Sequence, residues 1–301
     1  MSIRFGVSPI AWINDDLPAL GGDTPLETVL TDAQELGFSG IELGGKFPRE
    51  PRVLESMLSK HRLVLVGGWY SASLLTRSAE AEIEALQPHL ALLKAMGSGV
   101  FIVAETSNAI HGNQARPLSA TPRLADSDWK QFGRKLTDVA EHLARAGLRM
   151  AYHHHLGTVV ETQHDLERFL QSTAPSVGLT VDTGHAALGG VDTVSLIREN
   201  PERVAHVHCK DVRSTVYRRL RSEDGSFLSG VLQGMFTVPG DGDLDFAAVM
   251  EALAQMRYSG WIIVEAEQDP ALANPKVYAA LGLETLRSRA AAANLWKAEH
   301  A

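Results

Sequence analysis

Residues 129–155 read WKQFGRKLTDVAEHLARAGLRMAYHHH, a helical pattern that runs directly into a strand. Apolar residues recur at intervals of three and four along residues 129–148, which predicts an amphipathic helix with one buried face. The glycine at 147 stands where helices often end, and the apolar run at 148–152 predicts a strand. Three histidines, His153, His154 and His155, follow that strand. The stretch therefore predicts a helix and strand unit with ionisable side chains at the end of its strand.

The same alternation recurs along the whole chain. We predict strands at residues 3–8, 40–43, 63–68, 100–104, 148–152, 178–181, 205–208 and 261–265. Helical patterns separate these strands, so parallel pairing is favoured, and the units fit a single-domain (β/α)8 TIM barrel of the α/β class. A doubly wound open sheet is the alternative. No GxGxxG motif follows the first strand, which weakens that alternative and, with it, a nicotinamide cofactor.

Length and composition agree with one globular domain over residues 1–301. Hydrophobic residues make up 45% and charged residues 21% of the chain, an ordinary globular balance. The net charge of -8 argues against a nucleic-acid partner and favours a neutral or cationic small molecule. Cys209 is the one cysteine, so we expect a reducing, cytoplasmic location. We find no apolar run that predicts a signal peptide or membrane span, and the sequence leaves homo-oligomer formation open.

Ionisable residues gather at the predicted ends of strands five to eight, where TIM barrels place their active sites. Because alternate side chains of a strand share a face, His153, Asp182, His208 and Glu265 can all point into the barrel. Two imidazoles and two carboxylates around one point predict a site for one divalent cation. A lone histidine is more often a hydrogen-bonded structural residue, but burying several ionisable groups together without a counter-ion is costly.

Polar and aromatic side chains after the first four strands could bind hydroxyl groups. Glu42 and Lys46 follow the second strand, Trp69 follows the third, and Asn14 follows the first. We interpret them as a lining for a polyol or cyclitol substrate. A surface ion pair between Glu42 and Lys46, and packing of Trp69 beneath the loops, are the structural alternatives.

The longest connection, residues 213–245, joins the seventh and eighth strands. It contains a basic cluster that includes Tyr217, Arg218 and Arg219, followed by a stretch punctuated by glycines. Long loops next to an active site often act as lids, and we expect this segment to close over the mouth of the barrel. A solvated surface loop is the alternative.

The chain resembles the xylose-isomerase-like barrel superfamily and, within it, the inosose dehydratases of inositol catabolism. The resemblance covers nearly the whole chain and rests on SPIAWINDDLPALGG, GFSGIELGGKFP, AYHHHLGTVVET, VDTGHAALGG, HVHCKD and GWIIVEAEQDP. It implies a lyase that removes water from 2-keto-myo-inositol to give a trihydroxycyclohexane dione. It also implies manganese or cobalt as the metal, and glutathione has been associated with the activity.

The superfamily holds its metal with Glu, Asp, His and Glu from strands five to eight, and the last three match Asp182, His208 and Glu265. His153 stands where the isomerases and epimerases have the first glutamate. In epimerases that glutamate also lies beside the carbon whose proton moves, so its replacement removes one of two opposed bases. The histidine in place of this glutamate therefore favours elimination over epimerisation.

Dehydration requires a base for the α proton and an acid for the departing hydroxyl. The candidates are His155, His185, Lys210 and Glu105, together with His153 and Glu265, and the sequence does not assign the two roles. A neighbouring cation would disfavour the charged form of Lys210, whereas pairing with Glu267 or Asp182 is the structural alternative. A keto-sugar isomerase or epimerase, a phosphodiesterase acting on abasic DNA and a non-enzymatic sugar-binding barrel remain alternatives.

Overall fold

A closed barrel of parallel strands forms the centre of the protein in the computed structural model, which describes residues 3–297. Strand β1 pairs with both β2 and β10, and these two pairings close the barrel. The barrel strands are β1 (Ile3–Val7), β2 (Gly40–Leu43), β3 (Val64–Ala72), β4 (Val100–Glu105), β5 (Arg149–His153), β6 (Val177–Asp182), β7 (Val204–Cys209) and β10 (Gly260–Val264). The predicted TIM barrel is confirmed.

Each of the eight predicted strands corresponds to a barrel strand, and the largest difference in bounds is at β3. Strand β3 continues to Ala72, so Trp69 lies within the strand and not after it. Its last four residues pair with β4, beginning with Trp69 opposite Ile102. This extended pairing carries the Trp69 ring toward the mouth of the barrel.

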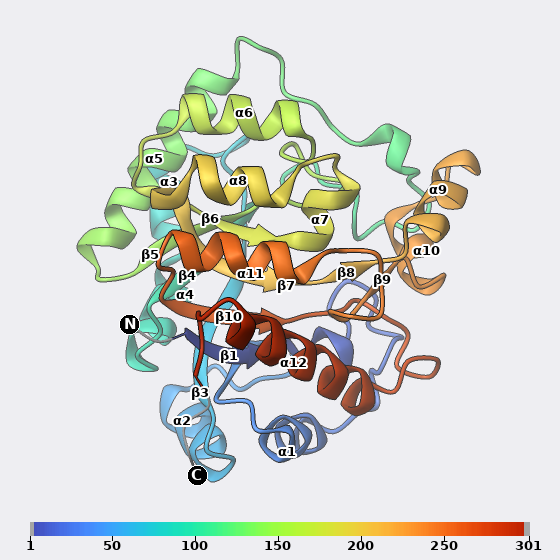
Figure 1. The fold of residues 1–301 in the computed structure, drawn as a ribbon. Coiled ribbons are helices and arrows are strands. Elements are labelled where there is room, and N and C mark those ends of the chain that lie inside the picture. The colour runs from blue at the N-terminus through green and yellow to red at the C-terminus, as the bar shows by residue number, and fades with distance from the viewer. Residues whose placement is uncertain (1–2, 298–301) are drawn as a thin grey trace.

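Helices surround the barrel, and Figure 1 shows them packed around the strands. They are α1 (Leu26–Leu36), α2 (Pro51–Lys60), α3 (Ala79–Ala85), α4 (Gln87–Ala95), α5 (Trp129–Arg145), α6 (Gln163–Ser172), α7 (Thr183–Leu188), α8 (Thr193–Glu199), α11 (Phe246–Gln255) and α12 (Pro275–Ala292), with short 3-10 turns at Pro9–Ala11, Leu118–Ala120 and Pro201–Arg203. Helix α5 confirms the predicted pattern, because it buries Phe132, Leu136 and Leu143 on one face. Gly147, with φ of 90°, follows it in the left-handed conformation that glycine adopts readily. Between residues 3 and 297 no helix combines the length and apolar character needed to cross a bilayer.

Apolar side chains pack against both the outer and the inner faces of the barrel strands. The larger core lies between the strands and the surrounding helices. Inside the barrel, Val66, Trp261 and Ile263 form one small cluster, and Ile102 and Ala151 belong to another. The ionisable residues lie at the carboxyl ends of strands whose inner faces carry these side chains, so the barrel supports them on a rigid base.

The 213–245 segment is folded and is not an open loop. It contains α9 (Ser214–Ser222), α10 (Phe227–Leu232) and β9 (Phe236–Thr237), which pairs antiparallel with β8 (Asp211–Val212). Phe227 and Phe236 are buried in a second apolar cluster, and Figure 1 shows α9 and α10 at the end of the barrel toward which β7 runs. The alternative of a solvated surface loop is wrong for this segment, because its apolar residues form a small core of their own.

Candidate active site

The four predicted metal ligands converge at the carboxyl ends of neighbouring strands. His153 ends β5, Asp182 ends β6, His208 lies in β7 and Glu265 directly follows β10, and all four are buried. One ligand atom from each lies within 4.8 Å of the others. His153 Nε2 and His208 Nδ1 lie 3.5 Å and 3.7 Å from Asp182 Oδ2, and His208 Nδ1 lies 2.5 Å from Glu265 Oε2. The alternation of side chains along the strands therefore brings these residues together as predicted.

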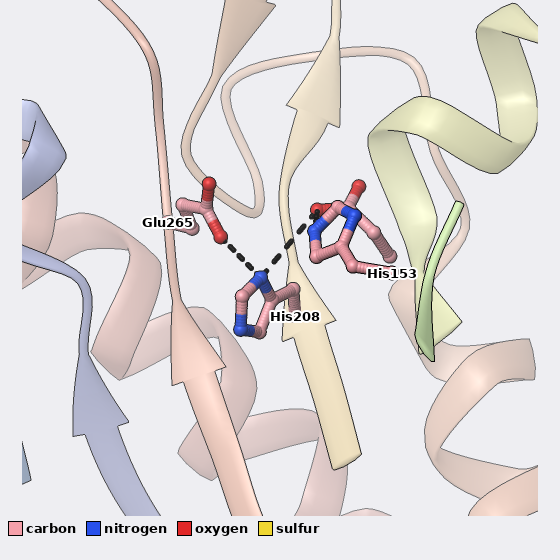
Figure 2. Close-up of side chains that lie close together, drawn as sticks. His153, His208 and Glu265 are labelled. Atoms are coloured by element: carbon pink, nitrogen blue, oxygen red, sulfur yellow. Dashed lines mark ion pairs between the residues drawn. The ribbon is translucent and has the colours of Figure 1, made fainter. Parts of the chain in front are cut away.

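This group fits a divalent cation on the chemistry of its donors. Figure 2 shows the His208 ring between Glu265 and His153. Among the described residues, Asp182 Oδ2, His208 Nδ1 and Glu265 Oε2 are buried without a well-aligned hydrogen bond, and they face one another. Ligand atoms held about 2.1 Å from one cation lie roughly 3.0–3.4 Å apart. The two imidazole nitrogens lie 3.5 Å and 3.7 Å from Asp182 Oδ2, so a small inward movement brings them to that spacing. Nitrogen and oxygen donors of this kind suit Mn, Co or Zn.

Glu42 reaches the same group from the other side of the barrel. Its Oε1 accepts hydrogen bonds from His206 Nε2 at 2.8 Å and His208 Nε2 at 3.0 Å. Burial alone would raise the pKa of Glu42, but the two imidazoles lower it to about 2. Burial would likewise lower the pKa of His208, but Glu42 and Glu265 raise it well above its usual range. Glu42 therefore contacts a predicted metal ligand and is not paired with Lys46.

Lys210 is a buried cation surrounded by carboxylates. Its Nζ lies 2.6 Å from Glu267 Oε1, 3.0 Å from Glu265 Oε1 and 3.7 Å from Asp182 Oδ2. Burial opposes its charge, but these carboxylates raise the pKa of Lys210 above its ordinary value. The pairing of Lys210 with Glu267 and Asp182, which the sequence left as the structural alternative, is therefore present in the structure. A side chain at position 184 would collide with the Lys210 stem, so Gly184 in the VDTGH sequence makes room for it.

Two further histidines lie beside Lys210 and beneath the 213–245 segment. His185 Nε2 is 3.1 Å from Lys210 Nζ, and the His155 and His185 rings are 3.7 Å apart between centroids. Burial lowers the pKa of both imidazoles well below the usual range. The Phe227 ring lies 5.1 Å from the His155 ring, and the Phe236 ring lies 5.1 Å from the His185 ring. The segment therefore contacts the candidate proton-transfer groups directly.

A cavity of about 360 Å³ is lined by three of the four predicted metal ligands, His153, His208 and Glu265. This volume is within the range of small-molecule sites, which are commonly about 300–1,000 Å³. Six predicted site residues line it: Glu42, Trp69, His153, His155, His208 and Glu265. The Trp69 ring lies edge-on to the His153 ring, with 5.3 Å between their centroids. The cavity thus presents one aromatic wall and one ionisable wall.

Three predicted residues lie elsewhere. Asn14 is buried, and its Oδ1 accepts hydrogen bonds from the backbone N–H groups of Asp16 and Leu17, as in a turn. The exposed Lys46 ammonium donates to the backbone carbonyls of Gly22 and Thr24. Glu105 accepts hydrogen bonds from Leu74 N at 2.6 Å and Ser107 N at 2.7 Å, so its carboxylate holds two loops. The structure does not bring these three side chains to the cavity.

Other lining residues were not among the predicted site residues. Asp16, Arg49 and Glu267 line the cavity, and burial raises the pKa of Glu267 to about 7 despite its contact with Lys210. Glu267 is two residues after Glu265, so in an extended chain both side chains point into the barrel. The sequence could therefore have indicated Glu267 as a site residue. Arg49 reaches the cavity from the loop after β2, and strand periodicity gives no information about a residue placed in this way.

Comparison with known proteins identifies the family to which this chain belongs. The family model for the xylose isomerase-like TIM barrel matches residues 30–289. The rhizopine catabolism protein MocC of Rhizobium meliloti is 47% identical over 97% of this chain and 90% of its own length. An inosose dehydratase of Geobacillus thermodenitrificans is 39% identical over 95% of this chain and 96% of its own. The chain belongs to the xylose isomerase-like TIM barrel family.

Within that family, the curated relatives support an enzyme of the hydro-lyase class. Further proteins named inosose dehydratase, including those of Lacticaseibacillus casei and Clostridium tetani, are 38% and 36% identical over more than nine tenths of the chain. A solved structure of a probable 3-DHS dehydratase, AsbF of Bacillus anthracis, superposes with a TM-score of 0.69 over 94% of this chain and 98% of its own. At 14% identity, that likeness shows the fold alone.

Proposed function

We propose that this protein is a metal-dependent dehydratase that removes water from 2-keto-myo-inositol in inositol catabolism. The observation that carries the proposal is the convergence of His153, Asp182, His208 and Glu265 on one point beside a small-molecule cavity. The similarity to proteins named inosose dehydratase supports the reaction class. The product is a trihydroxycyclohexane dione.

His153, Asp182, His208 and Glu265 would hold the cation, for which we propose manganese or cobalt. When bound, it would supply a positive charge that polarises the substrate's ketone and makes the neighbouring C–H group more acidic. The chain's own residues then have two tasks: to remove the α proton, and to protonate the hydroxyl that leaves from the next carbon.

Proton transfer is assigned to the groups that face or adjoin the cavity. His155 lines the cavity, and burial lowers its pKa and keeps it neutral. Its Nδ1 donates to the Leu156 carbonyl oxygen at 2.7 Å, so the lone pair that can accept a proton is on Nε2. Lys210 lies one contact away, 3.0 Å from Glu265 Oε1, with His185 beside it. Glu105 is bonded within loops outside the cavity, so we give it no proton-transfer role.

The cavity lining suits a polyhydroxylated ring. Carboxylates and the guanidinium of Arg49 can exchange hydrogen bonds with hydroxyl groups, and Trp69 offers an apolar surface to ring C–H groups. The functional test is incubation of the manganese-loaded protein with 2-keto-myo-inositol in deuterium oxide. We expect dione absorbance and solvent deuterium in the product, because the enol formed by water loss takes up a solvent proton as it becomes the ketone.

Chelated protein without added metal is the control, and it should form no dione. A ketohexose is the competing substrate. Rapid interconversion of ketohexose epimers, together with no dehydration of the inosose, would replace the dehydratase proposal with an epimerase.

We also propose that the 213–245 segment closes over bound substrate and excludes water. Its Phe227 and Phe236 rings already contact His155 and His185, and water exclusion protects a reactive enol. Tryptic cleavage within α9, after Arg218 or Arg219, is expected to slow when manganese and inosose are added together. Cleavage after exposed Arg62, in the turn before β3, is the internal control and should not change. An equal rate in α9 with and without saturating ligand would contradict closure.

A further inference from the structure

Glu42 lies outside the group formed by His153, Asp182, His208 and Glu265, yet its carboxylate contacts one member of that group, His208. Strand β2 is separated from β7 by β1 and β10 in the barrel, yet the Glu42 carboxylate reaches across the interior to two histidines of β7. Both Nε2 atoms meet the same oxygen, Oε1, at 2.8 Å and 3.0 Å. All three side chains are buried, and Glu42 is 6% exposed. A carboxylate in this position can fix how both rings are turned.

The two nitrogens of His208 have different partners. Nε2 faces Glu42, whereas Nδ1 faces Asp182 Oδ2 and Glu265 Oε2. A histidine binds a cation through the lone pair of one nitrogen, so its other nitrogen carries the proton and needs an acceptor. A carboxylate accepts hydrogen bonds and donates none when ionised. Glu42 therefore matches the tautomer of His208 that carries its proton on Nε2 and its lone pair on Nδ1.

We propose that Glu42 is a positioning residue that fixes the tautomer and ring orientation of His208, so that Nδ1 faces the metal site. His206 bonds to the same oxygen and limits the movement of the carboxylate. The inference rests on the proposed metal-dependent function. It gives Glu42 a different task from the hydroxyl binding expected from its place in the sequence.

The test is the dissociation constant for Mn²⁺, measured by titration with electron paramagnetic resonance detection in wild type, Glu42→Ala and Glu42→Gln. Loss of a partner that orients a metal-ligating histidine typically weakens metal affinity about 10- to 100-fold. We expect that loss in Glu42→Ala and a smaller loss in Glu42→Gln, whose amide oxygen still accepts hydrogen bonds. Glu82→Gln is the matched control, because Glu82 is a buried carboxylate that accepts from Tyr70 and Ser73 and contacts no predicted ligand. Its Mn²⁺ affinity should equal that of wild type.

A second measurement keeps the inference testable if Glu42→Ala does not fold. In the zinc-loaded protein, long-range ¹H–¹⁵N spectra distinguish the two tautomers of a histidine, and His208 should carry its proton on Nε2. Glu42→Gln should shift that Nε2–H resonance, because a neutral amide replaces the charged acceptor.

Three outcomes overturn the inference, and they are distinguishable. Wild-type Mn²⁺ affinity in Glu42→Ala, or an unchanged His208 resonance in Glu42→Gln, removes the role of Glu42 and leaves the metal proposal standing. Failure of the wild-type protein to bind Mn²⁺ removes both proposals together.

Discussion

Asp182→Asn is expected to lower dehydration of 2-keto-myo-inositol by at least about 10³-fold, because a cation can supply several kcal/mol of transition-state stabilisation. Asp182 Oδ2 faces both His153 and His208, so replacing it with an amide removes one negative charge from the centre of the ligand group. Mn²⁺ affinity should fall in the same variant. Steady-state kinetics and a Mn²⁺ titration measure the two effects.

Asparagine is chosen because Asp182 also caps a helix. Its Oδ1 accepts a hydrogen bond from His185 N at 2.8 Å, and the asparagine oxygen can keep that bond. Asp192→Asn is the matched control, since Asp192 Oδ1 caps α8 through Ser195 N at 3.0 Å, and exposed Asp192 is not among the clustered ligands. The control should retain wild-type turnover. An Asp182→Asn enzyme that keeps full activity and Mn²⁺ affinity would contradict the assignment of Asp182 as a ligand.

Most of the fold could be predicted from the sequence because each strand buries a short apolar run and each crossover supplies a helix. The exceptions have physical causes. Strand β3 is longer than predicted because pairing with β4 extends it past its apolar run to Ala72. The 213–245 segment is helical because Leu220, Phe227 and Met235 bury one another. The alternation of strands and helices in the sequence does not indicate this contact, because it lies within a connection between two strands.

Some contacts of the candidate site could be predicted from the sequence, and others could not. Side-chain parity along strands predicts that His153, Asp182, His208 and Glu265 converge. Side-chain alternation also argues against a place for Glu105 in the cavity. Ile102 in the same strand lines the cavity, and a residue three positions further along the strand faces the opposite side.

The contact between Glu42 and His208 could not be predicted from spacing. It depends on barrel closure, which brings side chains from distant strands together in the interior. Closeness in sequence is likewise no guide to contact. Lys46 is only four residues from Glu42, but it donates to backbone carbonyls in the preceding loop.

Lys210→Met is expected to have opposite effects on the stability of the metal-free protein and on its metal affinity. Methionine has a similar length but no charge, so Asp182, Glu265 and Glu267 would lose the buried ammonium that lies between 2.6 and 3.7 Å from them. Removing one partner of a buried ion pair costs about 3–5 kcal/mol, which corresponds to a drop in melting temperature of roughly 5–15 °C. Mn²⁺ should bind more tightly, because a like charge beside its ligands is gone. Thermal unfolding with and without Mn²⁺ measures both effects.

The loss of stability in Lys210→Met should also grow as the pH rises. Without Lys210, the pKa of Glu267 in the folded protein should rise further above its unfolded value. A raised carboxyl pKa contributes stability that is present below the unfolded pKa, about 4.5, and is lost as the pH increases through the folded pKa. Lys276→Met is the control, because Lys276 is a solvent-accessible lysine paired with Asp32 at 3.0 Å, and exposed ion pairs contribute little to stability. Equal melting temperatures for wild type and Lys210→Met at pH 8, with unchanged Mn²⁺ affinity, would show that Lys210 does not neutralise these carboxylates.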